Sequence, residues 1–184
     1  MMHIAPMNNG VAERHRDIVV ERNYFVSTSA STLFTEVIGT CTIRNNLFET
    51  DTGGFAIAVS AQSDIDNGSP TDTRIYNNTG YKKSTGGYSF IQISTETNYT
   101  AGYSPPTAIT GLDIRNNIAY APNAASAKFV DVVGLTPSYR AASSNNSSDT
   151  QVRTVRPWAA TTPTTYADFA PAIGSYAKDG GSTD

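Results

Sequence analysis

The chain has very little of several features that define common protein classes. A single cysteine, Cys41, stands among 184 residues, so no disulfide can form within the chain. Charged residues make up only 16% of the sequence and the net charge is −3, which argues against the clustered Lys and Arg of a nucleic-acid-binding protein. No apolar run reaches the roughly 18 residues that a membrane-spanning helix needs. We therefore expect neither nucleic acid nor a membrane as a partner.

Long helical patterns rich in Ala, Leu, Glu and Lys are also missing. Residues 1–9 lack the charged and apolar regions of a secretion signal, which predicts a cytoplasmic location unless a signal lies outside this sequence. His3 and His15 do not form a ligand pair, so a zinc site is not expected. Asn, Ser, Thr and Gly fill the composition instead, and these residues are typical of polar turns between strands.

One short phrase recurs along the chain: an aliphatic residue, a variable residue, a polar residue and then Asn. Its four clear copies are Val20-Glu21-Arg22-Asn23, Ile43-Arg44-Asn45-Asn46, Ile75-Tyr76-Asn77-Asn78 and Ile114-Arg115-Asn116-Asn117. The intervals between copies are unequal, but they fall within the roughly 20 to 50 residues typical of solenoids. Apolar and polar residues alternate before and after each copy, which indicates strands. The repeat therefore predicts a coiled parallel sheet whose strands end at an Asn-bearing corner.

Stacking the copies predicts which side chains lie over one another. Cys41 falls in an inward column with Ile18, so we expect it to be a buried, unreactive thiol. The other inward column is Val20, Ile43, Ile75 and Ile114. The two outward columns are Glu21, Arg44, Tyr76 and Arg115, and Val19, Thr42, Arg74 and Asp113. Opposite charges and Arg–Tyr stacking in these columns support the register. At the corner, an asparagine ladder is expected from Asn23, Asn46, Asn78 and Asn117.

The Ile-x-Asn-Asn corners, together with the ending Asp168–Ser175 and Asp179-Gly180-Gly181, resemble the pectate-lyase-like superfamily. The resemblance implies an all-β fold, a right-handed single-stranded parallel β-helix of about five coils. Residues 1–184 then form one domain, with an N-terminal cap or edge at 1–17, coils at 18–150 and a C-terminal capping segment at 151–184. Members of the superfamily usually have more coils. This chain resembles a short member or the C-terminal part of a longer one, and its exposed coil end predicts a homo-oligomer.

The same resemblance implies a polysaccharide partner and two kinds of chemistry. Lyases remove a proton with a Lys or Arg base and often use calcium, which is then the expected cofactor. The candidate residues are Arg44, Arg74, Arg115, Lys82, Lys83 and the acidic partner Asp113. The simpler interpretation is a solvated ladder of ion pairs and an exposed lysine turn. Glycoside hydrolases need paired carboxylates, and no secure pair stands out among Glu21, Glu36, Glu49, Asp51, Glu96, Asp113 and Asp131.

Two further groups of residues are candidate binding sites. Asp64 and Asp66 lie in a segment that superficially resembles a calcium loop, but Gly68 stands where such a loop needs a side-chain ligand, so a polar turn is favoured. Tyrosines gather between residues 81 and 106, where their rings offer sugar-stacking surfaces. These candidates are Tyr81, Tyr88, Tyr99 and Tyr103. The alternative is that some of them hold a long loop against the sheet.

The leading hypothesis is therefore a carbohydrate-interacting β-helix module without a catalytic constellation. The first alternative is an active polysaccharide lyase or glycoside hydrolase of the pectate-lyase-like superfamily. The second alternative is a structural protein that assembles by stacking through its coil ends.

Overall fold

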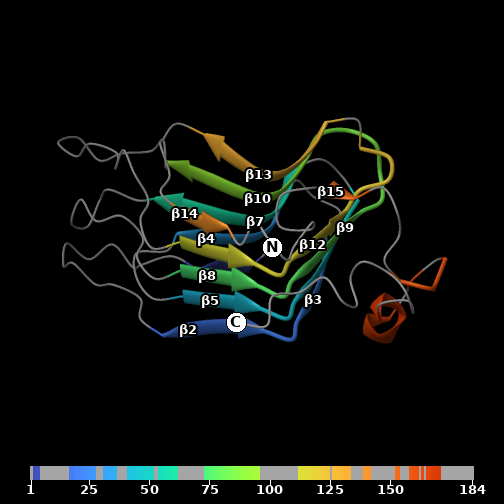
Figure 1. The fold of residues 1–184 in the computed structure, drawn as a ribbon, viewed down its shortest axis with the longest axis horizontal. Helices are drawn as coiled ribbons and strands as arrows, with labels where there is room; N and C mark the ends of the chain where they lie inside the picture. Colours follow the sequence, from blue (N-terminus) through green and yellow to red (C-terminus); the bar gives the residue numbers. More distant parts are fainter. Residues whose placement is uncertain are drawn as a thin grey trace.

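A computed structural model gives the fold of the chain (Figure 1). It describes residues 2–4, 17–27, 31–36, 41–51, 54–61, 73–95, 112–124, 126–133, 139–141, 152–153, 158–161, 163 and 165–170. The described residues form strands joined by turns, with one short 3-10 helix, η1 (Tyr166–Phe169). None of the helical structure in these ranges is long and apolar enough to cross a membrane.

The strands are short and follow one another closely along the chain. Seven of the fifteen described strands have four residues, and the longest have eight. Their bounds are β1 (Met2–Ile4), β2 (Ile18–Glu21), β3 (Tyr24–Ser27), β4 (Ser31–Glu36), β5 (Cys41–Arg44), β6 (Leu47–Thr50), β7 (Gly54–Ala61), β8 (Thr73–Tyr76), β9 (Thr79–Lys82), β10 (Tyr88–Thr95), β11 (Leu112–Arg115), β12 (Ile118–Tyr120), β13 (Ala127–Val133), β14 (Tyr139–Ala141) and β15 (Val152–Arg153).

Every third strand joins the same parallel sheet. The β1 sheet has the order β1-β4-β7-β10-β13, the β2 sheet β14-β11-β8-β5-β2 and the β3 sheet β15-β12-β9-β6-β3. All pairings between described strands are parallel. Figure 1 shows the strands of each sheet lying one above another while the chain passes from sheet to sheet. The sequence-based prediction of an all-β protein with parallel sheets is confirmed.

The register of the β2 sheet is the one that the repeat predicts. Val20 pairs with Ile43 and Ile43 with Ile75, which pairs in turn with Ile114. The outward positions also align, with Glu21 beside Arg44. A shift of one residue would turn every apolar side chain outward, so the buried isoleucines fix this register. Cys41 is buried as expected, and burial raises the pKa of its thiol to about 11.

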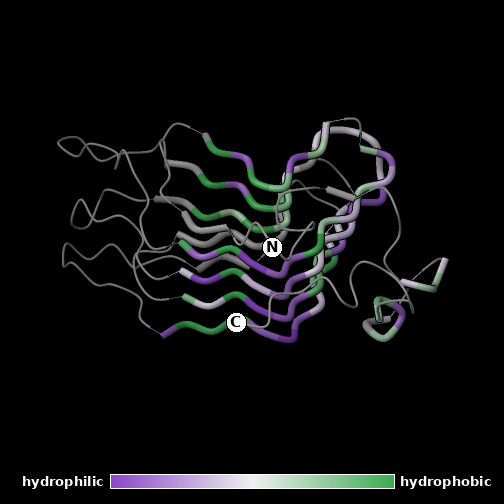
Figure 2. Tube along the Cα trace, in the orientation of Figure 1, coloured by the Kyte–Doolittle hydropathy of each residue, from purple (hydrophilic) through white to green (hydrophobic). Residues whose placement is uncertain are grey.

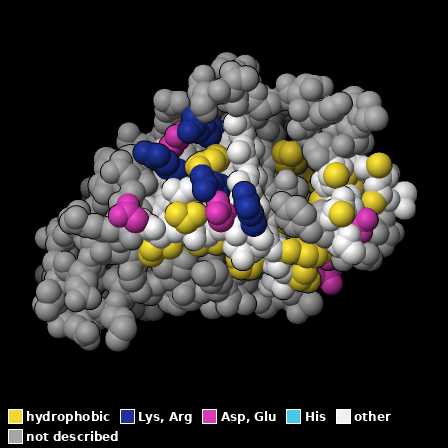
Figure 3. Space-filling view, turned by 90° about the horizontal axis from the view of Figure 1, so that it is seen from below, with side chains coloured by type: hydrophobic (Ala, Val, Ile, Leu, Met, Phe, Trp, Pro, Cys, Tyr) yellow, Lys and Arg dark blue, Asp and Glu magenta, His cyan; other side chains and the backbone are white. Residues whose placement is uncertain are grey.

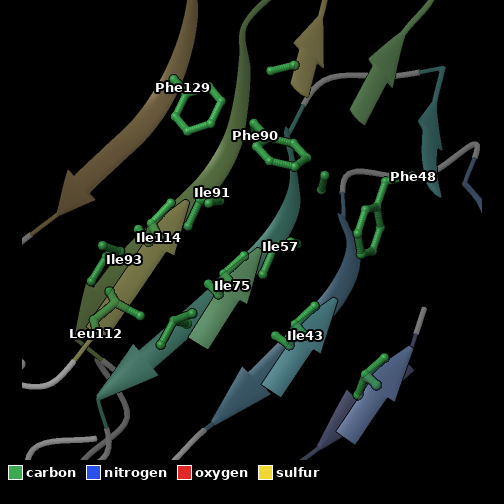
Figure 4. Close-up of a cluster of buried hydrophobic side chains, with 14 of the residues drawn as sticks. Ile43, Phe48, Ile57, Ile75, Phe90, Ile91, Ile93, Leu112, Ile114 and Phe129 are labelled. Carbon is green, nitrogen blue, oxygen red and sulfur yellow. The ribbon is translucent and has the colours of Figure 1, made fainter. Parts of the chain in front are cut away.

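The core lies between the sheets. Figure 4 shows isoleucines of the β2 sheet (Ile43, Ile75 and Ile114) facing isoleucines of the β1 sheet (Ile57, Ile91 and Ile93). Phenylalanines add a column of rings along the stack, in the order Phe25, Phe48, Phe90 and Phe129. Neighbouring rings in this column have centroids 5.0 to 6.5 Å apart. Like residues therefore stack on like residues, as expected where successive strands superimpose.

The bend from the β2 sheet into the β3 sheet has the same backbone form each time. The residue before the repeated Asn has a positive φ, between 55° and 57°, at Arg22, Asn45, Asn77 and Asn116. Asn adopts this left-handed conformation more readily than most residues, which explains why three of the four copies carry Asn-Asn. Figure 2 shows this bend as a hydrophilic strip between strands of mixed hydropathy.

The second asparagine of each pair is hydrogen-bonded to its counterpart on the neighbouring strand. Oδ1 of Asn78 accepts from the backbone N–H of Asn46 at 3.1 Å and from its Nδ2 at 3.0 Å. Asn117 receives the same two bonds from Asn78, and Asn46 receives them from Asn23. Asn46, Asn78 and Asn117 also donate Nδ2 to the carbonyls of Val20, Ile43 and Ile75, respectively. Side chains at the bend thus supply hydrogen-bond partners to buried backbone groups.

The described part of the C-terminal segment packs on the outside of the β3 sheet. Trp158 is buried, and its ring lies 5.1 Å from that of Tyr120 and 4.8 Å from that of Phe169, centroid to centroid. Phe169 also contacts Tyr24, so the segment reaches from β12 across to β3. Strand β6 lies between β3 and β9 in this sheet and is buried at all four positions. The described residues between 158 and 170 thus lie against the β3 sheet, and an end-capping role for the segment 151–184 stays a prediction.

Candidate functional site

Basic side chains gather on the outer face of the β2 sheet. In the view of Figure 3, Lys and Arg side chains form a row with acidic side chains between them. The outward residues of strands β2, β5, β8 and β11 supply three guanidinium groups and two carboxylates. We call the following set the arginine face: Glu21, Arg44, Arg74, Tyr76, Asp113 and Arg115.

Two of the three arginines are held in place by neighbours on adjacent strands. Arg44 donates Nε to Glu21 Oε2 at 2.6 Å and Nη1 to the Tyr76 hydroxyl at 3.0 Å. Arg115 lies over the Tyr76 ring, 5.6 Å from its centroid, and forms an ion pair with Asp113 at 3.5 Å. The predicted Glu21–Arg44 pair and the predicted Arg–Tyr stacking are both confirmed. Tyr76 thus joins two guanidinium groups across three strands.

Arg74 differs from these two arginines because it is exposed. It lies on β8, next to Asp113 in the strand pairing. Its place in the strand is two residues before Tyr76, so its side chain emerges on the same face as the Tyr76 ring. The arginine face therefore combines two oriented guanidinium groups with one that projects into solvent.

The arginine face is better suited to binding than to proton abstraction. Hydrogen bonds to Tyr76 and to Glu21 raise the pKa of Arg44, so its neutral, basic form is scarcer than usual. A base must lose its proton before it can take one from a substrate. Guanidinium groups that stay charged are, by contrast, good partners for carboxylates, because their planar fork matches two oxygens.

Lys82 lies apart from the other predicted catalytic residues. It ends β9 in the β3 sheet, and its side chain points inward with 0% exposure. Its Nζ donates to Oγ of Ser84 at 3.0 Å. Burial lowers the pKa of Lys82, with the Asp51 carboxylate acting in the opposite direction. Lys82 and the arginines Arg44 and Arg115 therefore lie on different sheets, and the expected exposed lysine turn is wrong for Lys82, whose side chain faces the interior.

A second polar cluster, which the sequence did not reveal, lies at the end of β6. Glu49 is 5% exposed, accepts a hydrogen bond from the Tyr24 hydroxyl and forms an ion pair with Lys83. Burial and the Glu49 hydrogen bond raise the pKa of Tyr24, and the same carboxylate raises that of Lys83. The Lys82-Lys83 doublet was the available signal. It could not show that one lysine points inward and the other outward.

The tyrosines predicted to bind sugar fall into three groups. Tyr81 packs against Tyr120 at 5.4 Å and against Trp158 at 5.4 Å, so its ring helps hold the C-terminal segment to the β3 sheet. Tyr88 begins β10, and its side chain lies outside the described part of the structure. Tyr99 and Tyr103 lie outside the described residues. The alternative that tyrosines hold a long loop against the sheet stays a prediction, because the described contacts of Tyr81 are with β12 and the C-terminal segment.

Candidate carboxylates and metal ligands are also distributed over the molecule. Glu21, Glu49, Asp113 and Asp131 each form an ion pair with an Arg or Lys. This pairing does not resemble two carboxylates facing across a glycosidic bond. Asp64 and Asp66 lie outside the described residues, and within those residues no group of three or more His, Cys, Asp or Glu could hold a metal ion.

Comparison with known proteins adds no relative to this picture: no family model, curated protein or solved structure matches the chain. Support for a function therefore comes from the geometry of the chain itself.

Proposed function

We propose that the chain is a right-handed, single-stranded parallel β-helix of about five coils with an asparagine ladder, related in architecture to the pectate-lyase-like superfamily. Three parallel sheets that each take every third strand support this proposal. The hydrogen bonds that join Asn23, Asn46, Asn78 and Asn117 support the ladder. In such a fold, outward side chains on successive coils form regular rows over a rigid surface, and these rows suit an extended polymer.

On that scaffold, the arginine face binds an anionic polysaccharide, and the module does so without catalysis. One observation carries this function: Arg44, Arg74 and Arg115 come from three consecutive strands of one sheet face. Adjacent strands are about 4.8 Å apart, so the guanidinium groups form a closely spaced array. A uronate polymer presents carboxylates at regular intervals along its length, and each carboxylate can accept two hydrogen bonds from one guanidinium. The ring of Tyr76 offers a surface for a sugar ring beside them.

Orientation makes this array selective. Arg44 and Arg115 are already held by Glu21, Asp113 and Tyr76, so little side-chain freedom is lost when a ligand binds. Arg74 is exposed and is the arginine that a ligand reaches first. The carboxylates on the same face disfavour ligands that lack a well-placed anion pattern, because an unmatched carboxylate would meet Glu21 or Asp113.

Binding to polygalacturonate, measured by titration calorimetry or affinity electrophoresis, tests the proposal. Arg74→Gln should weaken binding about tenfold, equivalent to about 1.4 kcal/mol. Lys128→Gln is the matched control, because it removes one positive charge from an ion pair on a different sheet. Binding to a neutral glucan that equals binding to the uronate polymer, or equal effects of the two variants, would overturn the assignment. New ultraviolet absorbance from an unsaturated product would favour the lyase alternative.

A specific observation also favours assembly as a second role. In the described residues, β2 and β3 are the first strands of their sheets, and the row of asparagine bonds ends at the exposed Asn23. The same two strands carry the exposed apolar side chains Val19 and Val26. Unpaired strand edges are ready sites for pairing with another chain. The homo-oligomer expected from the sequence would form through this edge.

A further inference from the structure

The two ends of the stack of strands have complementary steps. Each of the three sheets has five described strands, and a level of the stack takes one strand from each sheet. Strand β1 pairs with β4 and lies one level below β2 and β3, which stand at the level of β4. At the opposite end, β14 and β15 pair with β11 and β12 and lie one level above β13. We call β1, β2 and β3 the lower end and β13, β14 and β15 the upper end, and Figure 1 shows β2 and β13 at opposite ends of the stack.

We propose that copies of the chain stack head to tail, with the lower end of one copy on the upper end of the next. The steps then match, because β1 pairs with β13, β2 with β14 and β3 with β15. This inference rests on the assembly role proposed above and adds which surface of the second copy is bound and in which direction. A contact between two different surfaces does not close on itself, so the product is an open filament. Each copy adds five levels, a rise of about 24 Å.

The row of asparagines gives the stack a direction. Oδ1 of Asn46 accepts two bonds from Asn23 on the level below, and Oδ1 of Asn78 accepts two from Asn46. The same geometry directs Oδ1 of Asn23 toward the lower end, and none of the described residues donates to it. A head-to-tail copy brings a further bend with donors to this oxygen. Two lower ends related by a two-fold axis would instead bring acceptor against acceptor, so the row favours head-to-tail stacking.

Apolar side chains that the core leaves partly exposed lie at the two ends. On the lower end they are Ile18 of β2 and Phe25 of β3, and at the upper end they include Val130 and Val132 of β13. Isoleucines at the same places in the middle levels are fully buried. A copy stacked on either end would cover these side chains as a middle level does, which removes apolar surface from water.

The register of the columns continues across the proposed contact. Within one chain, Met2 and Val130 belong to the same column of the β1 sheet, so stacking sets Met2 of one copy beside Val130 of the next. The residues between them in this column are Leu33, Ile57 and Ile91. In the β2 sheet, the same step sets Val20 beside Ala141. Apolar positions therefore meet apolar positions without a shift of register.

Engineered cysteines test which ends meet. Val26 and Arg153 occupy one column of the β3 sheet, at its lower and upper end. Neighbouring strands are about 4.8 Å apart, a distance that a disulfide spans. A mildly oxidised, equimolar mixture of Val26→Cys and Arg153→Cys should therefore give a disulfide-linked heterodimer on a non-reducing gel. The double variant should give a ladder of covalent multimers.

The control mixture pairs Val26→Cys with Lys128→Cys. Lys128 is exposed on β13, at the same end of the stack as Arg153 but in a different sheet. Its heterodimer yield should be about tenfold lower than that of the test mixture, because the two cysteines would lie farther apart than a disulfide reaches. The native Cys41 is buried and serves as the internal reference in every variant.

Sedimentation velocity of the wild-type protein gives a second measurement that needs no variant. Head-to-tail stacking predicts a series of species that lengthens with concentration. Cross-linking of Val26→Cys to itself with none in the test mixture, or wild-type assembly that stops at a dimer, would overturn this direction of stacking and leave the assembly role in place. A wild-type protein that stays monomeric, with no cross-link in any mixture, would overturn both.

Discussion

At the scale of single residues, the asparagines at the bend give the clearest prediction about the stability of the fold. Asn78 connects three strands: its Oδ1 accepts from Asn46, and its Nδ2 donates to Asn117 and to the carbonyl of Ile43. Asn23 occupies the same place in its repeat but is exposed at the end of the row. Replacing Asn78 should therefore lower the stability of the protein more than the same replacement at Asn23.

We predict that Asn78→Ala lowers the free energy of unfolding by about 2 to 4 kcal/mol, because it leaves buried donors and an acceptor without partners. Asn23→Ala should cost less than about 1 kcal/mol, since water can replace its bonds. Urea denaturation followed by circular dichroism measures both values. Equal losses in the two variants would show that the row does not act through burial of its hydrogen bonds.

Among the four residues with a positive φ at the bend, Arg22 is the one whose side chain does not favour this left-handed conformation. It has a φ of 57°, where the corresponding positions hold Asn45, Asn77 and Asn116. We predict that Arg22→Asn raises the free energy of unfolding by about 0.5 to 1 kcal/mol, because Asn tolerates the left-handed region better. The reverse change, Asn77→Arg at an exposed corner, should lower it by a similar amount. Urea midpoints that move in the same direction for both variants would contradict this explanation.

At the scale of elements, strands whose apolar and polar residues alternate could be predicted from the sequence. Strands buried on both faces could not. The β2 sheet register followed from period-two patterns such as Ile18–Val20 and Cys41–Ile43, because only one face of each strand is apolar. Strand β6 has no such pattern, since Leu47 and Glu49 face outward and are still buried. The sheet that contains β6 is contacted by Trp158, which packs on Tyr81 of β9 and comes more than 100 residues later in the chain than Leu47 and Glu49.

The candidate site residues were likewise only partly predictable from the sequence. Arg44, Arg115 and Asp113 could be grouped from the sequence because they lie on strands whose register was predictable. Lys82 could not be assigned correctly, because it looks like a turn residue but occupies the last inward position of β9. Contacts made at strand ends depend on where a strand stops, and boundaries are the least certain part of a sequence-based prediction.

The aromatic attachment of the C-terminal segment can be tested through the only tryptophan in the chain. Phe169→Ala removes a ring 4.8 Å from Trp158, and we predict that it weakens docking of residues 158–170 by about 1 to 3 kcal/mol. The emission of Trp158 should shift to longer wavelength while the circular dichroism of the strands is retained. Phe25→Ala, within the core column, should instead lower global stability without shifting the native emission.

At the scale of the whole molecule, the decisive feature is the edge at β2 and β3, which no described strand pairs on its outer side. In a solenoid, each level is stabilised by the level on either side, and a first level has only one neighbour. Natural sheet edges are often protected by charge, by proline or by a covering segment. β3 instead carries the exposed Val26, which is 61% accessible. An edge of this kind favours pairing with a second copy of the chain.

The edge can be blocked without disturbing the rest of the stack. The carbonyls of Asn23 and Ser27 accept hydrogen bonds from residues 47 and 51, on the side facing β6. Backbone groups alternate in direction along a strand, so the N–H of Val26 points away from β6 toward the open edge. Val26→Pro therefore removes a donor needed for pairing between copies and none that faces β6, and proline is tolerated on edge strands.

We predict that the wild-type protein associates with increasing concentration and that Val26→Pro raises the dissociation constant at least tenfold, as measured by analytical ultracentrifugation. Val26→Thr keeps the N–H and reduces only the apolar surface, so it should weaken association less than the proline variant does. A larger effect of threonine would indicate side-chain contact in place of strand pairing. A wild-type protein that stays monomeric at high concentration would mean that another part of the chain protects this edge.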